Sequence, residues 1–167
     1  LKLTMNVPPI AISNTYATVI VDFKMCRYNV YLLLRDVYMN LLYISGRIKN
    51  KKRVESYIHA LSKELGIHRL STKTITVTFK NELDSDAQGY CLGDREEVEI
   101  DIARNSRGNP LSMESMMKTL AHEMVHAKQW LRGEINDRGD TWRGMETNGE
   151  EPWVVEAYDL EDTLYEK

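Results

Sequence analysis

One short segment constrains the local structure of this chain more than any other. His122-Glu123-Met124-Val125-His126 is an H-E-x-x-H motif. On a helix, two histidines four residues apart project from neighbouring turns and can reach one metal ion. Ser112 is placed to cap the start of such a helix, and Gly133 follows its end. We therefore predict a helix over residues 113–131 that carries a metal site.

The two histidines lie away from the apolar stripe of this predicted helix. At about 100° per residue they lie roughly 200° around the helix from the stripe. The stripe consists of Met113, Leu120, Met124, Ala127 and Leu131. The simpler alternative is a solvent-exposed helix face that carries two histidines by chance. We favour a Zn²⁺ site formed by His122 and His126, and we treat the methionines as core packing.

A catalytic zinc ion normally takes three protein ligands and a water molecule. No histidine follows His126, and Cys26 and Cys91 lack a chelating spacing, so a carboxylate is expected as the third ligand. On a helix predicted from Pro152 to about Tyr165, Glu156 lies within roughly 60° of the centre of the apolar stripe. A buried carboxylate needs a partner, and a metal ion would supply one. We therefore predict Glu156 as the third ligand.

Other readings of the third ligand stay open. Glu156 could instead be a carboxylate at the border of the helix, paired with an arginine such as Arg143. Asp140, Glu150 and Glu151 are weaker substitutes in the polar segment 134–151, which we expect to form a loop.

The middle of the chain has the two-residue period of strands. Ile75, Val77 and Phe79 alternate with threonines, which predicts a strand. Residues 87–92 and 97–102 flank a polar segment, 93–96, and predict a hairpin with an acidic outer face. A further strand is predicted over 16–23 and a loop over 105–110. We expect the 97–102 strand to lie near the metal site and to form a sheet edge that could hold an extended peptide.

The N-terminal half is predicted to contain two helices that pack together. A long helix follows from apolar residues at helical spacing, namely Leu33, Val37, Leu41, Ile44 and Ile48. A second helix covers about Lys52 to Leu65 and ends at Gly66, a residue suited to a left-handed terminator. The predicted fold class is therefore α/β (α+β), with N-terminal helices, a small mixed or antiparallel sheet, the H-E-x-x-H helix and a C-terminal helix.

Composition limits the classes of protein. The chain has 167 residues, of which 43% are hydrophobic and 28% charged, so we expect one globular domain over residues 1–167. Residues 1–15 could form an extended arm. The net charge of -3 makes nucleic acid an unexpected partner. Neither a signal peptide nor a transmembrane segment is expected, so the predicted location is the cytoplasm.

The C-terminal third, Leu120 to Leu164, resembles a known group of enzymes. Its segments LAHEMVHAKQWLRGE, TWRG and EEPWVVEAYDLE are similar to small phage and bacterial metallopeptidases of the SprT-like and minigluzincin type. The resemblance implies a zincin-like fold, zinc ligands at His122, His126 and Glu156, and Glu123 as the general base. It also implies hydrolysis of a peptide or protein substrate by zinc-activated water, in a bacterial or phage-infected cell or a virion. Tyr158, Tyr90 and Arg143 are candidate donors to the oxyanion.

Two other functions are open at this point. One is a non-catalytic zinc protein, structural or virion-associated, although the presence of Glu123 favours catalysis. The other is a DNA-associated SprT-like factor, suggested by a basic run that a solvated turn explains more simply. This basic run consists of Arg47, Lys49, Lys51, Lys52 and Arg53.

Overall fold

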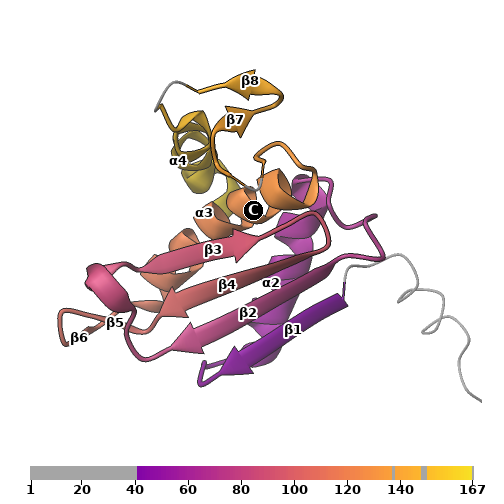
Figure 1. Ribbon diagram of the computed structural model, residues 1–167. Helices are drawn as coiled ribbons and strands as arrows, with labels where there is room; N and C mark the ends of the chain where they lie inside the picture. Colours follow the sequence, from indigo (N-terminus) through magenta and orange to yellow (C-terminus); the bar gives the residue numbers. More distant parts are fainter. Residues whose placement is uncertain (1–40, 137, 148–149, 167) are drawn as a thin grey trace, which may run out of the picture. The chain divides into compact units, whose positions relative to one another are not determined.

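The computed structural model describes residues 41–136, 138–147 and 150–166 (Figure 1). Within these ranges, three α-helices accompany a four-stranded sheet of order β1-β2-β4-β3. The main elements are β1 (Leu41–Gly46), α2 (Lys51–Glu64), β2 (Thr74–Lys80), β3 (Gly89–Gly93), β4 (Glu97–Ala103), α3 (Met113–Leu131) and α4 (Pro152–Tyr165). The predicted mixed α/β class is confirmed. The described residues fall within one compact unit, Val37–Lys167, and a single domain over 1–167 stays a prediction.

The sheet is mixed. β1 and β2 are parallel and joined by α2, β2 is parallel to β4, and β3 pairs antiparallel with β4 as the outer strand. The strand predicted at 75–79 and the hairpin predicted over 87–102 are confirmed. The peptide-binding edge predicted at 97–102 is wrong, because β4 is bonded on both sides and β3 forms the edge instead. The periodicity of a hairpin does not tell which of its two strands faces the rest of the sheet.

α2 and α3 cover one face of the sheet (Figure 1). The side chains between these layers are almost fully buried, and each contributes about 1.5–3 kcal/mol through removal of apolar surface from water. They include Ile58, Leu61, Ile75, Val77, Ile100, Ile102, Leu120 and Met124. This core holds α3 against the sheet along most of its length.

The second predicted helix is confirmed as α2, and its apolar side is buried as expected. Its chain reversal uses Gly66, whose φ of +67° is the left-handed conformation that glycine adopts without strain. The Arg132 guanidinium, just beyond the end of α3, donates to the carbonyl oxygens of Leu65 and Gly66 at 3.2 Å each. The C-terminal ends of α2 and α3 are thereby tied together.

The long N-terminal helix is wrong where it can be compared, because residues 41–46 form strand β1. Leu42 and Ile44 pair with Ile75 and Val77 of β2 and lie against the core, while Leu41 and Tyr43 are exposed on the other face. A short apolar run fits both a helical and a strand period, and pairing with β2 decides between them. Residues 33–40 of that helix and the strand predicted over 16–23 lie outside the described residues.

The two predicted loops contain short paired strands. β5 (Asn105–Ser106) pairs with β6 (Asn109–Pro110), and β7 (Thr141–Trp142) pairs with β8 (Met145–Glu146). A 3₁₀ turn, η1 (Asp84–Asp86), precedes β3. In the part of the chain that the structure describes, no helix combines the length and apolar composition needed to cross a membrane.

Candidate functional site

The H-E-x-x-H segment lies in the middle of α3, which spans Met113–Leu131 as predicted. The Ser112 hydroxyl caps the helix by accepting a hydrogen bond from the Ser115 amide at 3.0 Å. Thr119, His122, Glu123 and His126 follow at intervals of three, one and three residues, so they share one face of the helix. Together these four residues line one pocket.

This pocket, of about 580 Å³, is bounded by three elements. α3 supplies the motif, β3 and the preceding residues supply Gly89, Tyr90 and Cys91, and α4 supplies Val154, Tyr158 and Glu161. The His122 side chain is only 13% exposed, so the histidines do not lie on a solvent-exposed helix face. The motif therefore lies between the outer strand of the sheet and the C-terminal helix.

Glu123 packs directly against the backbone of β3. A Cβ atom placed on Gly89 would lie 2.6 Å from Glu123 Oε1 and 2.6 Å from Thr119 Cγ2. Glycine is thus needed at position 89 for the close approach of α3, not for a positive φ. Glu123 is 6% exposed, and burial together with the charge of Glu161 raises the pKa of Glu123 to about 8.

The Nδ1 atom of each imidazole lies within hydrogen-bond distance of a side-chain oxygen. His122 Nδ1 lies 3.1 Å from Glu161 Oε2, and His126 Nδ1 lies 2.7 Å from Gln129 Oε1. The two ring centroids are 5.0 Å apart, and the Tyr158 ring packs 4.6 Å from His122. Among the described residues, neither Nε2 atom has a hydrogen-bond partner. Both rings therefore keep one nitrogen available to a ligand in the pocket.

Burial sets the charge of the two rings. It lowers the pKa of His122, against the opposing effect of the Glu161 carboxylate. It also lowers the pKa of His126, against the hydrogen bond with Gln129. Lowered pKa values favour neutral imidazole, which is the form that binds metal ions.

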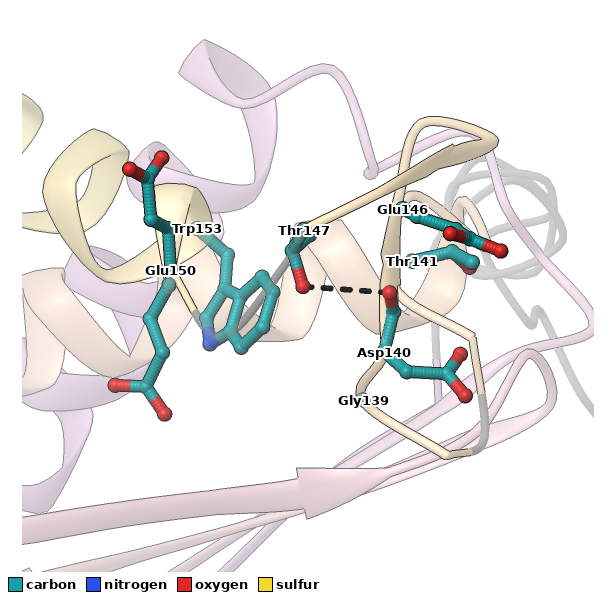
Figure 2. Close-up of a pocket in the computed structure, with 8 residues that line it drawn as sticks. Gly139, Asp140, Thr141, Glu146, Thr147, Glu150 and Trp153 are labelled. Carbon is teal, nitrogen blue, oxygen red and sulfur yellow. Dashed lines mark hydrogen bonds between the residues drawn. The ribbon is translucent and has the colours of Figure 1, made fainter.

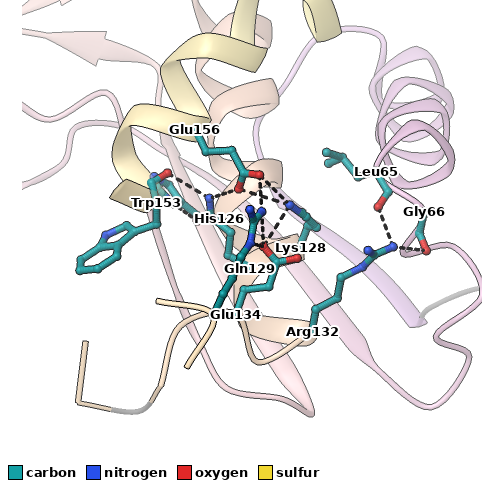
Figure 3. Close-up of polar contacts among 10 residues, drawn as sticks. Leu65, Gly66, His126, Lys128, Gln129, Arg132, Glu134, Trp153 and Glu156 are labelled. Carbon is teal, nitrogen blue, oxygen red and sulfur yellow. Dashed lines mark hydrogen bonds and ion pairs between the residues drawn. The ribbon is translucent and has the colours of Figure 1, made fainter. Parts of the chain in front are cut away.

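Glu156, the predicted third ligand, does not line this pocket. Its carboxylate accepts hydrogen bonds from Arg143 at 2.6 Å, Gln129 at 2.8 Å and Lys128 at 3.0 Å (Figure 3). Burial raises the pKa of Glu156, but the bonds from Gln129, Lys128 and Arg143 outweigh it and lower that pKa overall. The arginine pair considered as the alternative is thus present. Metal ligation by Glu156 stays a prediction.

Glu161 is the carboxylate that the sequence pattern missed. It lines the pocket with Val154 and Tyr158, at spacings of four and three residues along one face of α4. That spacing is present in the sequence, but the apolar stripe of α4 favours a different side of the helix. Across the residues that the structure describes, no set of three histidine, cysteine, aspartate or glutamate side chains is arranged to hold a metal ion.

The weaker substitutes for the third ligand lie elsewhere. Asp140, Glu150 and Glu151 line a second pocket of about 400 Å³, beside Trp153 and the β7–β8 turn (Figure 2). The Asp140 carboxylate accepts a hydrogen bond from Asn136 Nδ2 at 2.6 Å. Neither histidine of the motif lines this second pocket.

The candidate oxyanion donors are divided between the two regions. Tyr90 and Tyr158 line the pocket of the motif, and the Tyr90 hydroxyl donates to the Asp84 carbonyl oxygen at 2.9 Å. Arg143 instead pairs with Glu134 and Glu156. Only the two tyrosines are therefore placed near the motif.

Comparison of the chain with protein-family models, with curated proteins and with solved structures finds no significant match. The chemistry of the site is therefore inferred from its own residues.

Proposed function

We propose that this chain is a zinc-dependent peptidase with a zincin-like fold, in which His122 and His126 bind the metal ion and Glu123 is the general base. One observation carries the proposal. The three motif side chains line one pocket, with both Nδ1 atoms engaged and both Nε2 atoms available. Metal-binding histidines characteristically donate a hydrogen bond from their second ring N–H to a carboxylate or carbonyl oxygen.

The donor set fits a zinc ion in part. Two neutral imidazoles suit Zn²⁺, and a carboxylate is the expected third protein ligand. Two carboxylates are candidates. Glu161 is already at the pocket, 3.1 Å from His122. Glu156 would first have to leave Lys128 and Arg143.

A bound zinc ion would polarise the peptide carbonyl and lower the pKa of a water molecule. The protein's own contribution is proton transfer and exclusion of solvent. Glu123 lies in the wall of the same pocket, where the positive charge of a zinc ion would lower its raised pKa. Its carboxylate could then accept a proton from the attacking water and return it to the leaving amine. Its burial keeps bulk water away from that carboxylate.

The outer strand β3 is the proposed binding edge for the substrate. It borders the pocket through Gly89, Tyr90 and Cys91, and its outer edge carries no neighbouring strand among the described residues. An extended peptide can add to such an edge through backbone hydrogen bonds. The substrate class is therefore an extended segment of a peptide or protein.

Metal analysis and peptide cleavage test the proposal together. The wild-type protein should contain one zinc ion and cleave members of a peptide library, and a chelator should abolish both. His122→Ala and His126→Ala should each lose stoichiometric zinc, because each removes a ligand. Lys118→Ala is a suitable control, since Lys118 lies on α3 but pairs with Glu114 and Asp162 at the surface. Full zinc content in both histidine variants would reject the site.

Two other outcomes would point to the remaining functions. Stoichiometric zinc without cleavage of any peptide would favour a non-catalytic zinc protein. Salt-dependent DNA binding that is lost on neutralising the basic run would favour a DNA-associated factor. All five basic residues are exposed. Arg47 and Lys49 lie between β1 and α2, and Lys51, Lys52 and Arg53 form the first turn of α2, so a solvated turn and helix start account for them.

A further inference from the structure

A fully buried glutamine connects the H-E-x-x-H motif to α4. Gln129 is 0% exposed, and every polar group of its side-chain amide is bonded (Figure 3). Its Nε2 donates to Glu156 Oε2 at 2.8 Å and to the Trp153 carbonyl oxygen at 3.0 Å. Its Oε1 lies 2.7 Å from His126 Nδ1.

These contacts allow only one orientation of the amide. Carboxylate and carbonyl oxygens accept hydrogen bonds and cannot donate them, so the NH₂ group must face Glu156 and Trp153. Reversing the amide would place its oxygen against two other oxygens in a site without solvent. Oε1 therefore faces His126 and requires a proton on Nδ1 of that ring. The opposite nitrogen, Nε2, then keeps its lone pair.

The orientation of Glu156 is fixed in turn by two cations. Lys128 lies 3.0 Å from Glu156 and 3.1 Å from Glu134, and it is only 9% exposed. Arg143, from the turn between β7 and β8, lies 2.6 Å from Glu156 and 3.0 Å from Glu134. Two anions and two cations thus form a closed group that joins α3, the β7–β8 region and α4.

We propose that Gln129 is a positioning residue that fixes His126 in the Nδ1–H tautomer, with the Nε2 lone pair available to the pocket, and that the Glu156 group holds Gln129 in this role. The importance of that tautomer for metal binding rests on the proposed function. The tautomer itself does not, because it follows from contacts within the metal-free chain.

His122 supplies a comparison within the same protein. Its Nδ1 lies 3.1 Å from Glu161 Oε2, and no hydrogen bond joins Gln129 to His122. A change at position 129 should therefore alter His126 and leave His122 as it was.

Long-range ¹H–¹⁵N NMR of the imidazole rings, recorded on the full chain without metal, measures both tautomers. Wild-type His126 should be in the Nδ1–H form. Gln129→Met, which keeps the length of the side chain but removes the acceptor, should shift His126 toward the Nε2–H form while His122 is unchanged. The double variant Gln129→Glu/Glu156→Gln exchanges amide and carboxylate, so position 129 keeps an acceptor oxygen toward His126 and receives a donor from position 156. In this variant His126 should retain its Nδ1 proton. A general packing defect would not separate the two variants in this way.

A Zn²⁺ titration of the same proteins supplies a second measurement. If His126 is a ligand, Gln129→Met should weaken Zn²⁺ binding by about 10–100-fold, the usual cost of losing such a supporting contact.

Two results would overturn the proposal: wild-type His126 in the Nε2–H form, or an Nδ1–H form that persists in Gln129→Met. The first does not depend on whether any variant folds. A wild-type protein that binds no Zn²⁺ but holds His126 in the Nδ1–H form would reject the proposed function and support the role of Gln129.

Discussion

Glu161 Oε2, on α4, lies 3.1 Å from His122 Nδ1, on α3, and both residues line the same pocket. Glu156, on the same helix, makes no hydrogen bond or ion pair with either motif histidine and is held by Lys128, Gln129 and Arg143. Two carboxylates five residues apart on α4 therefore have different surroundings, and they should have different roles.

Replacing each carboxylate by alanine should show which of the two binds the metal ion and which only supports the site. If Glu156 is the third ligand, Glu156→Ala should lower Zn²⁺ affinity by orders of magnitude, and Glu161→Ala by only about 10–100-fold. If Glu161 is the ligand, the order should reverse. Zn²⁺ titration with a competing chelator decides between them. In both cases Glu156→Ala should also lower the free energy of unfolding of the metal-free protein by about 1–3 kcal/mol, because it removes an acceptor from Lys128 and Arg143.

Glu123→Gln should separate catalysis from metal binding. The glutamine keeps the shape of the side chain but cannot accept a proton, so zinc should remain bound while peptide hydrolysis falls by roughly 10²–10⁴-fold. Metal content and cleavage rate are measured on the same preparation. Loss of zinc in this variant would instead assign Glu123 to the ligand set.

Gly89→Ala should disturb the pocket by steric conflict with α3, without removing any polar group. Its methyl group would meet Glu123 and Thr119, and we expect a loss of about 1–3 kcal/mol in the free energy of unfolding together with reduced activity. Urea denaturation and peptide cleavage measure the two effects. Adding Thr119→Ser, which removes the Cγ2 methyl, should recover part of the stability. A double variant no more stable than Gly89→Ala would show that Thr119 is not the obstacle.

Tyr57 should make stability sensitive to alkaline pH. Burial, together with the charge of Tyr165, raises the pKa of Tyr57 to about 12 from the usual 10.0. The folded state therefore holds the Tyr57 proton at a pH where the unfolded state has lost it. The stabilisation is complete below about pH 10 and is lost as the pH rises toward about 12.

Comparing wild type with Tyr57→Phe isolates this group. The variant should lose less stability than wild type between about pH 10 and 12, as measured by urea denaturation at each pH. Parallel curves for the two proteins over that range would contradict the assignment.

The sequence by itself determined the elements whose causes are local. The motif helix α3 follows from apolar spacing and the Ser112 cap, α4 from Pro152 in its first turn, and β2 from strict alternation with threonine. The shared position of His122, Glu123 and His126 on one helix face follows from the geometry of a single helix, so the sequence is enough to predict it.

The tertiary structure alone decided what depends on neighbours distant in the sequence. Residues 41–46 are a strand because β2 offers a partner, and β3 is the edge because β4 pairs with β2. Helical phase places Glu156 beside an apolar stripe, but it cannot tell that Lys128 and Arg143 lie there, or that Glu161 faces His122. Phase gives a direction around one helix axis, whereas the partner of a side chain depends on how separate elements pack together.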